Sequence, residues 1–180
     1  LNELMRKQFL GSNNAPIKIK EFFSLTCGHC SNFHIKTLPQ LKKKYIDTGK
    51  VQLEFIDYPL DRLAVIAATL ARSIPTKDGY IEAVSILLKK QKQWAYSKNP
   101  LNELQSIAKL FGISSKKFND ISQNIPLMQE IVTKMEKESK NFDINSTPTF
   151  IVNDKYKISG ALSFKDFEKE LLKSINAKKS

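Results

Sequence analysis

The sequence contains only two cysteines, one tryptophan and six glycines in 180 residues, and it lacks long apolar runs. No stretch of 18 or more apolar residues occurs, so no transmembrane span is predicted. No apolar signal segment precedes the first strand-like stretch, and the chain begins at Leu1, which fits a mature or trimmed product. A disulfide between the two cysteines, Cys27 and Cys30, would close too short a loop to stabilise a fold through chain entropy. A purely structural disulfide is therefore the weaker interpretation.

The sequence also lacks a basic block long enough to form a nucleic-acid-binding arm, although its net charge is +11. We therefore predict no nucleic-acid partner. The lysines are spread along the chain, and we expect most of them on solvated helix faces, with attraction to acidic partners or anionic membranes as the alternative. The length and the apolar content of 41% suit one domain with a real core, or one domain that carries a sizeable insertion.

The first third of the chain predicts a strand, a helix and a second strand. Residues 17–23 alternate with period two, and Glu21 lies on the predicted inward face of this strand. Helical spacing begins at Cys27, with a kink expected at Pro39 because proline removes a backbone donor. Residues 51–57 form the second strand. This order indicates a βαβ unit with parallel strands and a right-handed crossover.

The middle of the chain contains helical patterns and no convincing strand. Helices are predicted at residues 63–74, 80–90, 101–110, 116–122 and 127–142. Strand patterns at 149–152 and 156–159 predict a hairpin, and Ser163 can cap a final helix that runs to Ile175. The predicted fold class is α/β, a thioredoxin-like βαβ…ββα order with an all-helical insertion.

Three regions follow from this order. Residues 16–60 and 143–180 form the thioredoxin-like domain, residues 61–142 form the inserted helical domain, and residues 1–15 form an N-terminal segment. Leu4, Met5 and Phe9 stand at helical spacing and could belong to a truncated oligomerisation stalk, which would make the protein a homo-oligomer. A short helix or strand that packs on its own domain is the alternative.

Cys27-Gly28-His29-Cys30 lies where a strand passes into the first turn of a helix, a place that favours an anion. Cys27 should face solvent as a nucleophilic thiolate with a lowered pKa, and Cys30, one turn deeper, should resolve a mixed disulfide. His29, if cationic, would add to the stability of the thiolate. The redox-active pair would need no other cofactor.

Zinc is the main competing chemistry, because the two cysteines, His29 and His34 are close in sequence. A structural zinc site needs four ligands, and the chain has no second cysteine pair, so no metal site is predicted. His34 taken alone is more often a packed helix residue than a catalytic one.

The segment 21–30, the helical insertion and the run Ser146-Thr147-Pro148-Thr149-Phe150 before a hairpin together resemble the DsbA-like thioredoxin family. The resemblance covers the chain from about Pro16 onward and implies thiol-disulfide oxidoreductase activity. It also implies a cis bond before Pro148, beside the cysteines, with Thr147 offering its backbone to an extended substrate. We assign Gly28, together with Thr147 and Pro148, to substrate binding.

The resemblance also gives Glu21 the position of the family's buried acid, with a hypothesised role in proton transfer to or from Cys30. A strand-edge glutamate paired with lysine is the alternative. The implied location is the periplasm, and the implied partners are unfolded or misfolded exported proteins and a membrane redox partner.

The family resemblance leaves the type of exchange open. The Gly28-His29 dipeptide is familiar from eukaryotic disulfide isomerases, and Thr147 resembles bacterial isomerases more than the principal oxidase. Disulfide formation and disulfide isomerisation both remain candidates for the catalysed reaction. A redox-linked chaperone that binds unfolded exported proteins is the alternative from a different functional class.

Overall fold

The computed structural model describes residues 1–179, and within this range the strands form one five-stranded sheet in the order β1-β3-β2-β4-β5. The strands are β1 (Gln8–Leu10), β2 (Ile17–Phe23), β3 (Val51–Asp57), β4 (Thr149–Val152) and β5 (Tyr156–Ser159). β2 and β3 are parallel, and the other neighbouring pairs are antiparallel. β2 is thus flanked by β3 and β4, and its end leads directly to the cysteines.

The helical stretch after β2 is continuous but irregular. It consists of α1 (Gly28–Asn32), the π-helical η1 (Phe33–Thr37), α2 (Leu38–Leu41) and the π-helical η2 (Lys42–Ile46). Pro39 lies in the first turn of α2, where its missing N–H is tolerated, and the N–H of Leu38 bonds the carbonyl of Phe33. Where the sequence predicted a kink at Pro39, the structure shows a change of helix type.

The remaining helices are α3 (Arg62–Arg72), α4 (Gly79–Lys89), α5 (Gln91–Trp94), α6 (Pro100–Lys109), α7 (Ser115–Ile121), α8 (Ile125–Phe142) and α9 (Phe164–Lys179). α3 to α8 all lie between β3 and β4 in sequence, so the predicted α/β fold with an all-helical insertion is confirmed. None of the described helices is long and apolar enough to cross a membrane.

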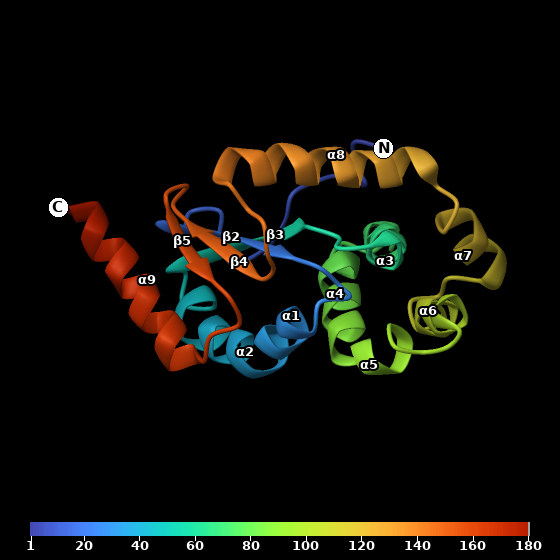
Figure 1. Cartoon of the computed structure of the whole chain (residues 1–180), viewed down its shortest axis with the longest axis horizontal. Coiled ribbons are helices and arrows are strands. Elements are labelled where there is room, and N and C mark those ends of the chain that lie inside the picture. Colours follow the sequence, from blue (N-terminus) through green and yellow to red (C-terminus); the bar gives the residue numbers. More distant parts are fainter. Residues whose placement is uncertain (180) are drawn as a thin grey trace.

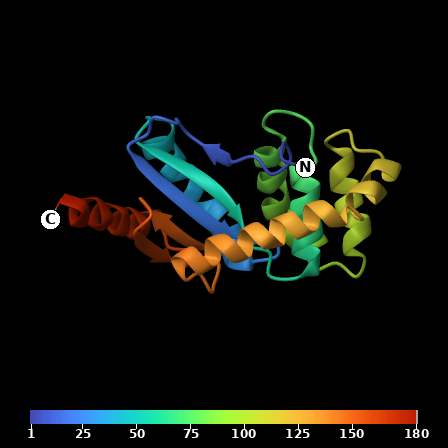
Figure 2. The same ribbon diagram turned by 90° about the horizontal axis from the view of Figure 1, so that it is seen from above.

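Helices cover both faces of the sheet (Figure 1). α1 and α2 lie on one face, and α8 runs along the other. α8 returns from the helical insertion to the sheet and packs against α3 and β3 (Figure 2). Phe22 and Ile56 point to the α8 face, where they form a small apolar cluster with Ile151. β2 is therefore buried on both faces, and not on the one face that its alternation suggested.

The N-terminal segment differs from the helical stalk considered above. Residues 8–10 form strand β1, which pairs antiparallel with β3, placing Gln8 opposite Phe55 and Leu10 opposite Leu53. Leu4 and Met5 pack against the main core from a turn. The physical reason is the exposed edge of β3, whose backbone N–H and C=O groups need partners. Of the two interpretations of the N-terminal segment, the structure agrees with a strand that packs on its own domain.

A buried polar cluster joins the end of β3 to the helical insertion. Arg72 on α3 donates from Nε to Asp57 Oδ2 at 2.8 Å, and the Tyr80 hydroxyl on α4 donates to Asp57 Oδ1 at 2.8 Å. Arg72 also donates to the carbonyls of Leu4 and Arg6 at 3.2 and 3.1 Å. One guanidinium thus ties the sheet, α3 and the N-terminal segment together.

Replacing Arg72 with methionine should lower the free energy of unfolding by about 3–5 kcal/mol, because the buried Asp57 carboxylate loses its cation. Denaturant unfolding followed by circular dichroism measures the change. Arg62→Met, on the exposed face of the same helix, is the matched control and should change stability little. Equal losses in the two variants would contradict the stabilising role of the buried pair.

Candidate active site

Cys27 is the residue on which helix α1 begins. Its backbone is extended, with φ −84° and ψ 117°, and its Sγ accepts a hydrogen bond from the N–H of Cys30 at 3.2 Å. The sulfur therefore acts as the N-cap acceptor for a helix that has no side-chain oxygen at this position. Both cysteines are free thiols, and Cys27 is 7% exposed whereas Cys30 is 0% exposed. Only the first sulfur is open to an incoming thiol.

The two cysteine thiols have very different pKa values. A hydrogen bond from the Cys30 thiol is the largest contribution that lowers the pKa of Cys27, and a hydrogen bond from the Thr147 side chain and the N–H groups of Cys30 and His29 act in the same direction. Burial opposes them, and the resulting pKa of Cys27 is about 6. Burial raises the pKa of Cys30, and the neighbouring Cys27 and the charge of Glu21 raise it further. At neutral pH the pair holds one thiolate, on Cys27, and one thiol, on Cys30.

Thr147 and Pro148 lie on the other side of the nucleophile. The peptide bond between them is cis, as the family resemblance implied, and the Thr147 carbonyl lies 3.6 Å from Cys27 Sγ. Pro148 is buried, and its carbonyl accepts a hydrogen bond from the N–H of Gly160 at 2.9 Å. β4 begins at the next residue, so the sheet holds the Thr147 backbone against the sulfur.

Gly28 and His29 are both exposed on the first turn of α1. The His29 side chain makes no hydrogen bond or ion pair within residues 1–179, and the contact with the thiolate runs through its backbone N–H. The proposed electrostatic effect of a cationic His29 therefore stays a prediction. Gly28 lies beside Tyr96 and Gln91 of the helical insertion.

Glu21 lies at the centre of the sheet and is 0% exposed. It pairs in register with Phe55 of β3 and Phe150 of β4, so it is not a strand-edge residue. Its partner is His34, whose Nε2 lies 2.8 Å from Oε2 and 3.0 Å from Oε1. The lysine-paired, strand-edge alternative for Glu21 is thus wrong.

His34 is the residue that sequence reasoning left out of the site. The available signal was its spacing, because it follows Cys30 by four residues and so lies on the same face of the helical stretch. Its ring also contacts Phe23, Phe33 and Phe55. The imidazole brings a polar partner to the buried Glu21 carboxyl group among these aromatic side chains.

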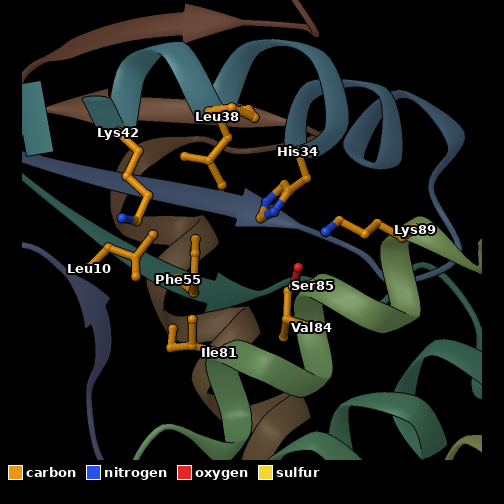
Figure 3. Close-up of a pocket in the computed structure, with 10 residues that line it drawn as sticks. Leu10, His34, Leu38, Lys42, Phe55, Ile81, Val84, Ser85 and Lys89 are labelled. Atoms are coloured by element: carbon orange, nitrogen blue, oxygen red, sulfur yellow. The ribbon is translucent and has the colours of Figure 1, made fainter. Parts of the chain in front are cut away.

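A cavity of about 250 Å³ borders the ring of His34. Figure 3 shows His34 facing Phe55 across this space, with Lys42 and Lys89 reaching toward it from opposite sides. Every buried side-chain nitrogen or oxygen in the described part of the chain has a hydrogen-bond partner, and Nε2 is the atom that bonds Glu21. The His34 side chain is 6% exposed, so the ring that bonds Glu21 also has an edge at the cavity.

Helical-insertion residues hold the loop that precedes Cys27. Gln91 Nε2 donates to the carbonyls of Leu25 and Cys27, both at 2.9 Å, and Gln91 is buried. Thr26 Oγ1 donates to Asp61 Oδ2 at 3.0 Å, and Asp61 in turn caps α3. Nothing in the local pattern around Gln91 pointed to this role, because α5 was not predicted.

The described residues contain no group of three or more His, Cys, Asp or Glu side chains arranged to hold a metal ion. His34 is engaged with Glu21, and Cys30 is fully buried, so the zinc ligands considered from sequence do not converge. The arrangement is that of a dithiol pair with one activated sulfur and a buried acid.

Comparison with known proteins gives the same picture. The family model described as Thioredoxin matches residues 4–173. A Rickettsia typhi relative named as a protein-disulfide oxidoreductase is 31% identical over 144 residues, which is 80% of this chain and 53% of the relative. This chain therefore spans about half the length of that relative. A Bacillus anthracis relative named as disulfide bond formation protein D is 28% identical over 177 residues, covering 94% of this chain and 77% of the relative.

The fold is similar to a solved structure over nearly its whole length. The crystal structure of a double cysteine-to-alanine variant of alpha-DsbA1 from Wolbachia pipientis aligns with a TM-score of 0.83 and 32% identity. The alignment covers 96% of this chain and 94% of that one.

The hydrogen bond from Cys30 to Cys27 can be tested by two substitutions that differ only in a donor. Cys30→Ala removes the side-chain donor, so the pKa of Cys27 should rise from about 6 toward its ordinary value. Cys30→Ser keeps a hydroxyl donor and should hold the pKa of Cys27 below that of the alanine variant. Thiolate absorbance at 240 nm as a function of pH measures both, and identical titrations would contradict the assigned cause.

Proposed function

Because the chain belongs to the thioredoxin family as one of its DsbA-like thiol-disulfide oxidoreductases, we propose that it forms disulfides in exported proteins through Cys27 and Cys30. The observation that carries the proposal is the Cys27 sulfur, which caps a helix N-terminus at 3.2 Å from the Cys30 N–H and lies beside the Thr147 carbonyl. This sulfur is an activated nucleophile and a good leaving group at neutral pH.

The proposed exchange begins with the pair as a disulfide. A client thiolate attacks the sulfur of Cys27, which forms the client–Cys27 bond and breaks the Cys27–Cys30 bond. Cys30 leaves as a thiolate and takes up a proton. A second client thiolate then attacks the client sulfur of the mixed disulfide and releases Cys27 as a thiolate. The client loses two electrons and gains a disulfide, and the pair is reduced.

The first step leaves a negative charge on Cys30, where burial raises the pKa of the thiol. The proposed proton donor is the protonated carboxyl group of Glu21, which is bonded to His34 and which in its ionised form acts electrostatically on Cys30. His34 borders the cavity, so it connects the buried acid with solvent. We thus assign proton transfer to Glu21. His34 holds the Glu21 carboxyl group in position and passes it a new proton from solvent.

The low pKa of Cys27 favours oxidation of client thiols over the reverse reaction. A lowered pKa stabilises the reduced form, which makes the disulfide form a stronger oxidant. The proposal includes a periplasmic location and a membrane redox partner that removes two electrons from the reduced pair. Isomerisation is the second candidate, because Gly28 is exposed beside the nucleophile and carries no side chain that would cover it.

The decisive experiment uses ribonuclease in two forms. The oxidised protein should restore activity to reduced, unfolded ribonuclease, and Cys27→Ser should abolish this effect. The reduced protein is tested in parallel on scrambled ribonuclease, where recovery of activity would mark an isomerase. Failure with both substrates would contradict the proposed function, and suppression of aggregation that survives Cys27→Ser would indicate a binding protein.

Glu21→Gln tests the proton-transfer role. Glutamine keeps the size and a hydrogen bond to His34 but carries no titratable proton, so reduction of the Cys27–Cys30 disulfide by a dithiol should slow by about tenfold or more and change its pH profile. Stopped-flow rates between pH 4 and 9 measure the effect. Glu82→Gln, an exposed carboxylate on α4, is the control. A Glu21→Gln profile that overlays the wild-type curve would exclude the role.

A further inference from the structure

A groove of about 580 Å³ begins at Gly28, between the two reactive cysteines in sequence. One wall comes from residues 28–36 of the active-site helical stretch, and the other from residues 88–96 at the junction of α4 and α5. Figure 1 shows α1 beside α4 and α5, which lie far apart from it in sequence. The groove therefore runs along the contact between the thioredoxin-like domain and the helical insertion.

The groove carries positive charge that no carboxylate neutralises. No acidic residue lines it, and four exposed lysines do: Lys36, Lys90, Lys92 and Lys89, the last of which also borders the His34 cavity. None of the four forms an ion pair with any residue in the range 1–179, although other lysines of the chain do. We call this feature, with these four residues, the lysine groove. Its charge is available to a ligand.

The lysine groove begins at Gly28, the residue that follows the nucleophile. A Cβ atom at Gly28 would lie 3.6 Å from the Tyr96 hydroxyl and 4.0 Å from Gln91 Oε1, so a larger side chain there would fill this end of the groove. Glycine at the second position of the motif thus leaves this end of the groove open, one residue away from Cys27.

The two walls are held in a fixed position relative to Cys27. Gln91 bonds the Cys27 carbonyl at 2.9 Å, and Ser31 Oγ donates to the Leu88 carbonyl at 2.6 Å. Ile35 and Tyr96 add apolar surface, with 45% and 63% exposure. The groove therefore offers a preformed site with cations on both walls and two apolar contacts.

We propose that the lysine groove binds an acidic segment of the client polypeptide that flanks the reacting cysteine, and that it gives the enzyme a preference for such clients. The inference rests on the proposed function. The polypeptide is favoured as occupant because the site is concave, has lysines on both walls and continues into the motif that bonds the client sulfur. An anionic membrane is the competing occupant, since it would meet the same charge.

The test compares three synthetic peptides with the same two cysteines, flanked by aspartate and glutamate, by serine, or by lysine. Each rate of reaction with the oxidised protein is divided by the rate of the same peptide with hydroxyethyl disulfide, which removes the effect of the flanks on thiol reactivity. At low ionic strength the normalised rate of the acidic peptide should exceed that of the serine peptide by about tenfold, and the lysine peptide should be slowest. The preference should shrink strongly in 0.5 M salt.

Two triple variants with the same change in net charge locate the effect. Lys36→Gln/Lys90→Gln/Lys92→Gln removes lysines from both walls and should reduce the acidic-to-serine rate ratio to about threefold or less. Lys116→Gln/Lys117→Gln/Lys137→Gln removes three exposed lysines from α7 and α8 and should retain the ratio. An equal loss in both variants would overturn the inference, because the preference would then come from net charge.

The remaining outcomes separate the inference from the function beneath it. If the wild-type protein oxidises all three peptides at equal normalised rates, the lysine groove selects no client and the proposed function stands. If it oxidises none, both fail. A flat peptide preference, together with sedimentation on phosphatidylglycerol vesicles that only the groove variant loses, would overturn the inference in favour of a membrane contact.

Discussion

The start of helix α1 is the constraint on which the site depends. The first N–H groups of any helix need acceptors, and at this position the chain offers a sulfur where helices usually have a hydroxyl or carboxylate oxygen. Cys27 Sγ accepts from the Cys30 N–H at 3.2 Å, so the need of the helix for an acceptor becomes stabilisation of a thiolate. The backbone geometry that places the cap also sends Cys30 into the core, where a thiolate is disfavoured. One local requirement thus makes the two sulfurs chemically unequal.

The second constraint is a carboxyl group at the centre of the sheet. Glu21 lies between Phe55 and Phe150 on the neighbouring strands, where an unpaired polar group would be strongly destabilising. The partner comes from the helical stretch that carries the cysteines, since His34 follows Cys30 by four residues and faces β2. The acid therefore links the sheet to the reactive helix through a hydrogen bond. This arrangement explains why a polar group is retained in a layer that is otherwise aromatic.

Most of the fold could be predicted from sequence because its strands and helices carry strong local patterns. The predicted ranges for β2, β3, β4 and β5 coincide with those observed, and the predicted helices of the insertion start and end within about two residues of the observed ones. β1 and α5 were missed because they are short and depend on tertiary contacts: β1 on the open edge of β3, and α5 on the burial of Gln91 and Trp94. The same limit applies to the site. The motif residues and Glu21 were visible, and the spacing of His34 from Cys30 placed it on the same helix face. The contact of His34 with Glu21 and the bonds of Gln91 join separate segments, and no local pattern encodes them.

The helical insertion belongs to the site as much as the thioredoxin-like domain does. Gln91 holds the Cys27 carbonyl from the side of the insertion, and the Thr147 carbonyl approaches the sulfur from the side of β4. The nucleophile therefore stands between two elements that follow it in the chain by 64 and 120 residues. The buried Asp57–Arg72 pair stabilises this relation, because it fixes α3 to the end of the strand that runs beside β2. A reactive sulfur held from both sides can change its bonding partner without moving its backbone, so the site presents one geometry to successive thiols.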